Sequence, residues 1–236
     1  LLCLGALVVP LVYIAPRYAP PPSLRESDLP SDLHEVHAVF GDGIELIGYT
    51  SDDTPRAPGE SQPVTLYWRA AKSMGRDYAV ALHLLGQGGA EIGKIDTWPG
   101  GGSAPTSAWT PGTIFADSYL LPIESGAAAP SLTRLDLGFW DGDPADQLPI
   151  AAPNGERLSA VTFTVGRVVP SRSPQFAPAI VEGSLFEYGI ALLGVDVGEG
   201  GVFTLYWQTA QPISADYTVF VHLLDANGNQ VAQADA

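Results

Sequence analysis

Apolar and polar residues alternate along several short stretches of this chain, and the alternation predicts β-strands. In "VTLYWRA", Val64, Leu66 and Trp68 share one face and polar or aromatic side chains share the other, a period of two that is typical of a half-buried strand. "YAVALHLL" at residues 78–85 is apolar on both faces, which favours a central strand. Further strands are predicted at residues 114–121, 133–140 and 161–168. Since no stretch after residue 33 shows a sustained helical period, we predict an all-β chain of antiparallel, immunoglobulin-like β-sandwiches.

An internal duplication is the most informative feature of this pattern. Three motifs return in order: "FGDGIELIGY" at Phe40 as "FEYGIALLGV" at Phe186, "VTLYWRAA" at Val64 as "FTLYWQTA" at Phe203, and "DYAVALHLL" at Asp77 as "DYTVFVHLL" at Asp216. The first motif is offset by 146 residues and the other two by 139, so the copies differ by a seven-residue deletion. The deletion falls in a Pro- and Gly-rich stretch between Gly48 and Val64, where a loop is expected. The sequence therefore predicts two copies of one folded unit.

The spacing of the copies predicts a domain organisation. We expect the end of a transmembrane helix at 1–16, a Pro-rich linker at 17–35, a first β-sandwich repeat at 36–169, a linker at 170–182 and a truncated second repeat at 183–236. The apolar run "LLCLGALVVPLVYIAP" is shorter than the roughly 20 residues that span a bilayer, which is why only the end of a span is expected. A clipped signal peptide or a buried segment remains an alternative.

The net charge and the cysteine content restrict the classes of partner and of site that this chain can have. The net charge of -15, from 26 acidic and 11 basic residues, would repel the phosphates of a nucleic acid, so no nucleic-acid partner is expected. A single cysteine excludes an intramolecular disulfide and a cysteine-based zinc site. We predict no cofactor and no metal. The acidic balance after the linker is consistent with β-domains on the extracytoplasmic side of a cell membrane.

A family resemblance follows from the motifs. The series "GIELIGY", "VTLYWRA", "DYAVALHLL", "KIDTWPGGGSAPTSAWTPGTIFADSYLLPI", "LDLGFWD" and "VTFTV" resembles the β-sandwich repeats found after the membrane core of bacterial dolichyl-phosphate-mannose mannosyltransferase-like glycosyltransferases. The resemblance implies a membrane protein with extracytoplasmic β-domains. It also implies that any transferase chemistry lies outside these 236 residues.

One long loop carries the candidate ligand-binding residues. The stretch "TWPGGGSAPTSAWTPG" separates two predicted strands and contains Trp98 and Trp109. Long loops concentrate binding surfaces, and aromatic rings can stack on the C–H faces of sugars. With Trp140 and the neighbouring Asp96, these residues are the candidate glycan site. The alternative is that the tryptophans anchor the loop against the sandwich.

Repeated polar residues are better explained by structure than by chemistry. His83 and His222 occupy the same repeat position, each without a second histidine or a cysteine at metal-site spacing, and are expected to be structural. Asp77 and its counterpart Asp216 are expected to accept a backbone N–H at the start of a strand. Trp68 and Trp207 are expected in the core.

The acidic turn "DGDPAD" at Asp141 resembles a calcium loop only superficially. The position of the final ligand in the twelve-residue pattern, residue 152, is Ala instead of Glu. No Ser-His-Asp, Cys-His or Gly-rich phosphate motif is present either. We therefore predict a noncatalytic extracytoplasmic module of a membrane-anchored protein, in contact with the membrane through its N-terminal helix and with glycan or envelope polymer. A glycan-binding or adhesive array unrelated to a transferase, or a plain spacer, are the alternatives.

Overall fold

The computed structural model describes residues 20–41, 43–141, 146–151, 157–171, 176–209, 211, 213, 215 and 217–235. The apolar run at residues 1–16, predicted as the end of a transmembrane helix, lies outside these residues. Within the described part of the chain, no helix has the length and apolar character that crossing a membrane requires. The chain divides into two compact units: unit 1, residues 1–171, and unit 2, residues 172–236.

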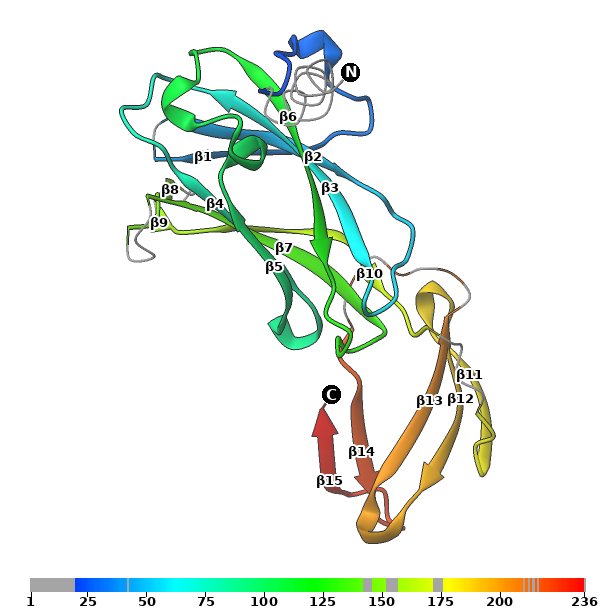
Figure 1. Cartoon of the computed structure of the whole chain (residues 1–236). Helices are drawn as coiled ribbons and strands as arrows, with labels where there is room; N and C mark the ends of the chain where they lie inside the picture. Colours follow the sequence, from blue (N-terminus) through cyan, green and yellow to red (C-terminus); the bar gives the residue numbers. More distant parts are fainter. Residues whose placement is uncertain are drawn as a thin grey trace, which may run out of the picture. The chain divides into compact units, whose positions relative to one another are not determined.

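Unit 1 consists of two antiparallel sheets (Figure 1). The first sheet has the order β6–β3–β2–β1–β8–β9, with β1 (His34–Phe40), β2 (Ile44–Ser51), β3 (Ser61–Ala70), β6 (Ile114–Pro122), β8 (Ile150–Ala151) and β9 (Arg157–Leu158). The second sheet has the order β10–β7–β4–β5, with β4 (Ala79–Leu85), β5 (Glu91–Thr97), β7 (Ser131–Trp140) and β10 (Val161–Val168). The described helical segments of this unit are short 3₁₀ turns: η3 (Glu26–Asp28), η4 (Gln87–Gly89), η5 (Pro99–Gly102) and η6 (Thr106–Ala108). The prediction of an all-β chain is confirmed.

The core of unit 1 lies between the two sheets. On β3 the alternation places Leu66 and Trp68 inward, fully buried, as the sequence predicts. Trp68 contacts Phe40 of the same sheet and Phe139 of the opposite sheet in edge-to-face geometry, with ring centroids 6.4 and 5.1 Å apart. Such pairs add about 0.5 to 1.5 kcal/mol each to the free energy gained by burying the rings. The Trp68 cluster therefore joins the two layers.

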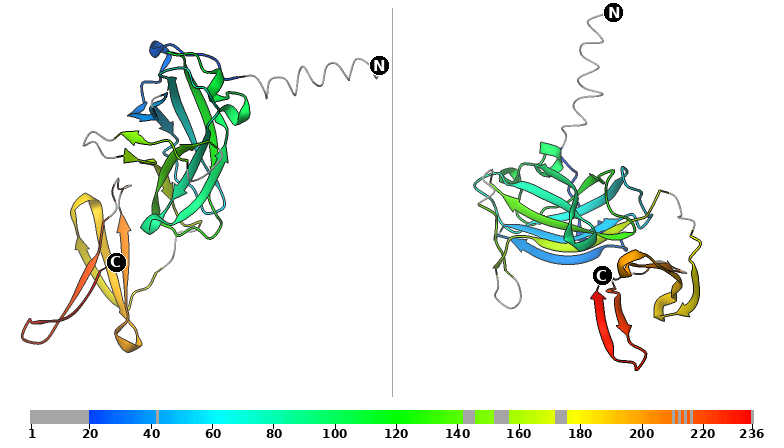
Figure 2. Two further views of the ribbon diagram at one scale, coloured as in Figure 1. Left: turned by 90° about the vertical axis from the view of Figure 1, so that its left-hand side faces the viewer. Right: turned by 90° about the horizontal axis from the view of Figure 1, so that it is seen from below.

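Unit 2 contains a three-stranded sheet and a hairpin. The sheet has the order β11–β12–β13 and the hairpin is β14–β15, with β11 (Ile180–Leu185), β12 (Ile190–Val197), β13 (Phe203–Thr209), β14 (Phe220–Leu224), β15 (Gln230–Asp235) and the 3₁₀ turns η7 (Glu187–Gly189) and η8 (Glu199–Gly201). Figure 2 shows these strands from two further directions. They correspond in order to β1–β2–β3 and β4–β5 of unit 1.

The strand register of the two units is the same, residue for residue. Leu46 pairs with Trp68 on β3, and Leu192, 146 positions later, pairs with Trp207 on β13. In both β2 and β12 a bulge separates this leucine from the next paired residue, which is Gly48 or Gly194. A Cβ atom at either glycine would collide with a carbonyl oxygen of the neighbouring strand, so the repeated glycine is a steric requirement. The duplication inferred from the sequence is therefore a duplication of strand register.

The pairing of the first strands extends the repeat beyond the motifs that revealed it. His34 pairs with Tyr49 on β2, and Ile180 pairs with Val195 on β12 at the same repeat position. Strand β11 thus begins within the segment 170–182 that the sequence predicts as a linker. Part of the predicted linker 17–35 is also ordered against unit 1, since the backbone N–H of Leu24 donates to the carbonyl of Ile114 at 2.7 Å.

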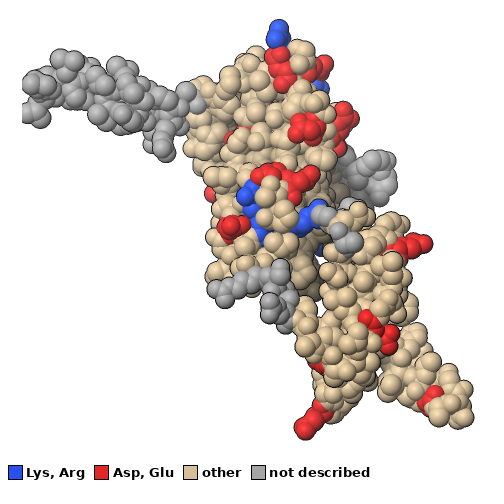
Figure 3. All heavy atoms as spheres, turned by 90° about the vertical axis from the view of Figure 1, so that its right-hand side faces the viewer, with Lys and Arg blue, Asp and Glu red and all other residues tan. Residues whose placement is uncertain are grey.

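On the face that Figure 3 shows, acidic side chains are more prominent than basic ones on both units. In unit 1 several of them have basic partners; Arg69, for example, contacts Glu26 and Glu45 at 2.5 and 3.3 Å. Residues 176–236 contain seven acidic residues and no lysine or arginine; the acids are Glu182, Glu187, Asp196, Glu199, Asp216, Asp225 and Asp235. Like charges repel, so unit 2 disfavours both a polyanion and a second copy of itself.

Position-matched tryptophan substitutions test the different burial of the two units. Trp68→Ala removes a fully buried ring and should lower the free energy of unfolding of unit 1 by about 3 to 5 kcal/mol. The prediction that Trp207 lies in the core is wrong for the described part of unit 2, where this residue is only half-buried. Trp207→Ala should therefore cost unit 2 less than about 2 kcal/mol. Denaturant unfolding of the whole chain, with residue-resolved NMR to separate the units, measures both values. Equal losses would contradict the assignment of burial.

Candidate functional site

Four connections meet at one end of the unit 1 sandwich. Because adjacent strands are antiparallel, the β1–β2 turn, the segment 71–78, the loop 98–113 and the segment after Trp140 all lie at this end, as the pairs Ala70 with Ile44 and Ala79 with Trp140 show. We call it the loop end. It carries a small pocket and most of the residues that the sequence nominates as a site.

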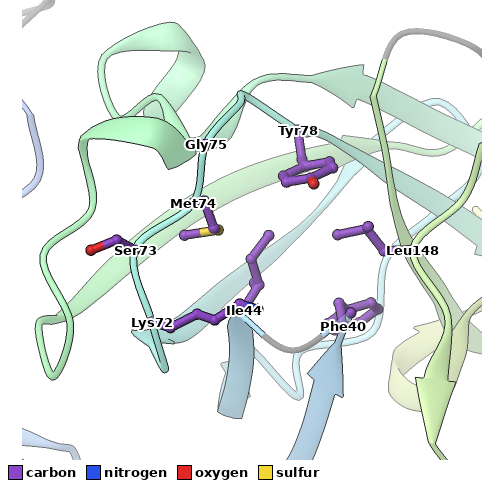
Figure 4. Close-up of a pocket in the computed structure, with 10 residues that line it drawn as sticks. Phe40, Ile44, Lys72, Ser73, Met74, Gly75, Tyr78 and Leu148 are labelled. Carbon is purple, nitrogen blue, oxygen red and sulfur yellow. The ribbon is translucent and has the colours of Figure 1, made fainter.

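The pocket has a volume of about 190 Å³ and an apolar floor (Figure 4). Phe40 and Ile44, both fully buried, form its base, and Met74, Tyr78 and Leu148 surround it. The remaining lining residues are Gly41, Gly43, Lys72, Ser73 and Gly75. Sites for drug-sized ligands run from about 300 Å³ upward, so this pocket has room for one ring-sized group.

The sequence places this pocket through two turns. Strand β1 ends at Phe40 and β2 begins at Ile44, so the tight turn brings both apolar side chains to the mouth between the sheets. Tyr78 lies on the inward side of the chain just before β4 and packs against the core. Lys72 reaches toward Ile44 along the edge of the pocket, whereas the hydroxyl of Ser73 points away from it (Figure 4). The pocket thus combines an aromatic and aliphatic surface with an ammonium group.

The corresponding corner of unit 2 is also aromatic. Tyr217 occupies the repeat position of Tyr78, and its ring centroid lies 5.8 Å from that of Tyr188 in the turn between β11 and β12. Phe186, the counterpart of Phe40, contacts Trp207 at 5.6 Å. Each repeat therefore places a tyrosine beside the same turn, with an open pocket in unit 1 and a tyrosine pair in unit 2.

The loop 98–113 is fixed to the sandwich by buried polar groups. The buried carboxylate of Asp117 on β6 accepts hydrogen bonds from the Gly100 N–H at 2.8 Å and the Tyr119 hydroxyl at 2.5 Å. The Thr106 hydroxyl, also buried, accepts from the Tyr78 N–H and donates to the Arg76 carbonyl. Asp117 thus ties the loop to β6, and Thr106 ties it to the segment 76–78 beside the pocket. The loop is therefore a fixed wall of the loop end.

Burial sets the protonation behaviour of this anchor. Burial raises the pKa of the Asp117 carboxyl, and the hydrogen bonds from Tyr119 and Gly100 lower it in part. Burial also raises the pKa of the Tyr119 phenol well above its ordinary value, and the neighbouring carboxylate adds to this shift. Tyr119 therefore remains a hydrogen-bond donor at neutral pH.

The predicted site residues divide between two surfaces. Asp96 is in register with Ala81 and Gly138 on the outer face of the second sheet, and Trp140, half-buried, lies one row nearer the loop end on that face. Trp98, a residue that is 42% exposed, continues the extended backbone of β5 past Asp96. β5 and β7 are separated by β4, which places the backbones of Asp96 and Gly138 about 10 Å apart, and Trp140 lies one row farther along β7.

Trp109 lies apart from the other three. Its side chain is buried, its ring stacks edge-to-face on Phe115 at 4.5 Å, and its indole N–H donates to the Ala104 carbonyl at 2.9 Å. This geometry is that of a loop anchor, the alternative that the sequence left open. Whether Asp96, Trp98 and Trp140 bind a ligand stays a prediction.

Other polar residues from the sequence have structural partners. His83 lies between Glu91 and Asp96 on the outer sheet face, at 3.2 and 3.4 Å. Asp77 accepts the backbone N–H of Ser107 at 2.9 Å, the kind of bond predicted for it. Asp141 pairs with Arg76 at 2.5 Å, while residues 142–145 of the acidic turn lie outside the described part of the chain. Among described residues, no three histidine, cysteine or acidic side chains are grouped to hold a metal ion.

The sequence did not single out most of the pocket. Met74 and Leu148 lie in connections without a motif, whereas Phe40, Ile44 and Tyr78 belong to repeated motifs that did not indicate a pocket. The pocket arises where residues 40–44, residues 72–78 and Leu148 come together, and periodicity along the chain cannot reveal such a meeting.

Comparisons with known proteins assign this all-β chain to no family. No protein-family model matches it, and no curated protein matches it. Among solved structures, the crystal structure of the C-terminal domain of Wzt is similar over 63% of this chain and 90% of that chain, with 8% sequence identity and a TM-score of 0.37. Since similarity at this level supports no conclusion about ligand or partner, function has to be argued from the geometry.

Substitution of Asp117 tests the anchor of the loop. Asp117→Ala leaves the Gly100 N–H and the Tyr119 hydroxyl without their acceptor, and should cost about 1 to 3 kcal/mol of stability. Asp117→Asn keeps an acceptor oxygen without a buried charge and should cost less. Denaturant unfolding of the three proteins measures the order, and Asn being as harmful as Ala would contradict it.

The same variants test the pH dependence. Because its folded-state pKa is raised, Asp117 contributes stability that is fully present below its ordinary pKa of 3.8 and is lost as pH rises through the folded-state value. The stability of Asp117→Asn relative to the unsubstituted chain should therefore increase as pH rises above about 4 and then level off. Denaturant titrations between about pH 3.5 and 7.5 measure this difference, and a constant difference would argue against the raised pKa.

Proposed function

We propose that this chain is a noncatalytic extracytoplasmic module of a membrane-anchored protein, the C-terminal part of a membrane glycosyltransferase, and that its β-sandwich repeats contact glycan or cell-envelope polymer. Three observations support the proposal: the N-terminal apolar run, the Pro-rich segment after it, and the repeated sandwich motifs. The family resemblance of these motifs supports the link to a glycosyltransferase. The module holds a glycan, and chemistry takes place elsewhere in the protein.

The observation that carries glycan contact is the aromatic and aliphatic pocket at the loop end. A sugar ring presents a C–H face, which packs on apolar and aromatic surface, and a rim of hydroxyls, which need polar partners. Tyr78, Ile44 and Leu148 offer the first kind of surface, and the side chain of Lys72 lies along its edge. The volume of about 190 Å³ suits one sugar ring at a chain end or branch better than a long stretch of polymer.

Charge and chemistry support a neutral ligand and a binding role. The net charge of -15 opposes capture of a polyanion. The ten residues that line the pocket include no aspartate, glutamate, histidine or cysteine, so its described lining supplies no carboxylate or imidazole for general acid-base work. A neutral glycan is the ligand class that fits these surroundings best.

A plain spacer is the second candidate, and the repeat itself favours it. Two units with the same register would extend a chain from a membrane without binding anything. A glycan-binding or adhesive array outside any transferase is the third. The three differ in whether glycan binds and whether the chain is membrane-anchored.

A pocket-filling substitution tests glycan contact. The whole chain, immobilised, should bind members of a panel of neutral mono- and oligosaccharides. Met74→Trp should fill the pocket and weaken that binding at least about tenfold, or about 1.4 kcal/mol. Ile213→Trp, the matched change at the same repeat position of unit 2, should leave it unaltered. Calorimetry measures the affinities and circular dichroism verifies folding. Absence of binding by the unsubstituted chain would favour the spacer, and equal binding by both variants would move the site elsewhere.

Fractionation of cells tests membrane anchoring separately. The whole chain, produced in a bacterium, should sediment with membranes and be digested by protease added to spheroplasts. Deletion of residues 1–16 should release it into the soluble fraction. A whole chain found in the soluble fraction, or protected from external protease, would contradict the proposed localisation.

A further inference from the structure

Unit 2 leaves open a face that unit 1 covers. Phe40, Val64 and Leu84 of unit 1 are at most 2% exposed. Their repeat counterparts Phe186, Phe203 and Leu223 are 51, 40 and 46% exposed. Since the register of the strands is the same, the difference does not come from the direction of these side chains. It comes from what packs on them.

In unit 1 the covering layer is formed by β6, β7 and β10. β6 pairs with the outer edge of β3, from Arg69 with Ile114 to Ser61 with Pro122, and β7 pairs with the outer edge of β4. Their inward side chains, including Leu121, Leu135, Leu137 and Phe139, are fully buried in the core. Among the described residues of unit 2, no strand occupies the corresponding edges of β13 and β14.

The open face is a groove with an apolar lining. A cavity of about 380 Å³ lies between the three-stranded sheet and the hairpin of unit 2. Its lining residues are Gly201, Phe203, Leu205, Trp207, Val219, Val221 and Ala234. None of them is charged, and five sit at positions whose unit 1 counterparts belong to the core cluster. An apolar groove beside two unpaired strand edges accepts an added strand, through backbone hydrogen bonds and alternate side chains.

We infer that the groove of unit 2 is a docking site for β-strands with the residue pattern of β6 and β7, which complete its sandwich as they complete that of unit 1. The occupant is a strand of the repeat's own second-half type. A second copy of unit 2 suits the groove less well, because residues 176–236 carry seven acidic and no basic side chains and would repel their like. The β7 segment, "SLTRLDLGFW", balances Arg134 against Asp136 and brings no net charge.

The register of unit 1 specifies how the strand docks. Leu84, Leu82 and Val80 of β4 pair with Leu135, Leu137 and Phe139 of β7. The same positions on unit 2 are Leu223, Val221 and Val219. A β7-type strand therefore pairs with the free edge of β14 and directs two leucines and a phenylalanine into the groove. This inference stands independently of glycan binding.

A peptide with the sequence of residues 131–140 tests the inference on the whole chain. Hydrogen exchange measured by mass spectrometry should slow at least about tenfold at residues 220–224 when the peptide is saturating. Residues 79–85, already paired with β7, should not change and serve as the internal reference. The control peptide carries serine in place of its two inward leucines and its phenylalanine, and should have no effect.

Two substitutions on adjacent positions of β14 separate docking from general effects. Leu223→Asp, on the inward side, should abolish protection by the peptide, and Leu224→Asp, on the outward side, should retain it. Absence of slowing at residues 220–224, or equal slowing by the serine peptide, would overturn the inference. A third result would also overturn it: in the absence of peptide, exchange at residues 220–224 becomes slower as the protein concentration is raised. The occupant of the groove would then be a second copy of the chain.

Discussion

Contact between two inward rows of apolar side chains, one from each sheet, is the interaction on which unit 1 depends. Trp68 and Phe40 come from one sheet and Phe139 from the other, and their rings meet at centroid distances between 5.1 and 6.4 Å. A strand alternates its side chains between two faces, so this contact also determines what is left outside. The outward residues, such as His83 and Asp96, form the polar surface of the second sheet.

The duplicated unit shows how far local sequence determines structure. Bulges at Gly48 and Gly194, and the pairing of Trp68 and Trp207 with equivalent leucines, recur although the surroundings differ. Register is thus a property of strand sequences and of close backbone approach at one glycine. Burial is a property of the complete sandwich. Trp207 faces the same way as Trp68, yet it is only half-buried, because the described residues of unit 2 include no counterpart of β6 or β7.

This distinction explains which features the sequence could predict. The apolar pattern located β3 through its period of two and β4 through its two apolar faces, and strands were also predicted where β6, β7 and β10 lie. Repetition pointed to Trp68 and to the hydrogen bond of Asp77. Strand β11 was missed because its alternation is weak and its counterpart β1 is equally polar. The loop-end pocket was missed because Met74 and Leu148 meet only through the closure of the sandwich. The anchoring role of Asp117 could not be predicted, because the other inward residues of its strand are aromatic or aliphatic. The hydrogen bond from the backbone N–H of Gly100 to its carboxylate becomes visible only in the structure.

The tryptophans of the long loop are a further feature whose burial the sequence could not predict. Trp98 and Trp109 lie eleven residues apart in one loop, and the sequence offered the same two readings for both. The structure exposes one ring and buries the other, because Trp109 packs on Phe115 while Trp98 follows the outward side of β5. The packing partner of Trp109 and the acceptor of its indole N–H decide between the two readings, and neither can be read from the composition of the loop.

Native-state hydrogen exchange on the unmodified chain compares the two copies most directly. The amides of residues 64–70 and those of residues 203–209 occupy the same repeat positions with the same inner-strand partners. If covering by β6 and β7 makes the difference, residues 64–70 should exchange at least about a hundredfold more slowly than residues 203–209, a difference of about 2.7 kcal/mol in opening free energy. Equal protection of the two strands would contradict the account, because unit 2 would then be as well covered as unit 1.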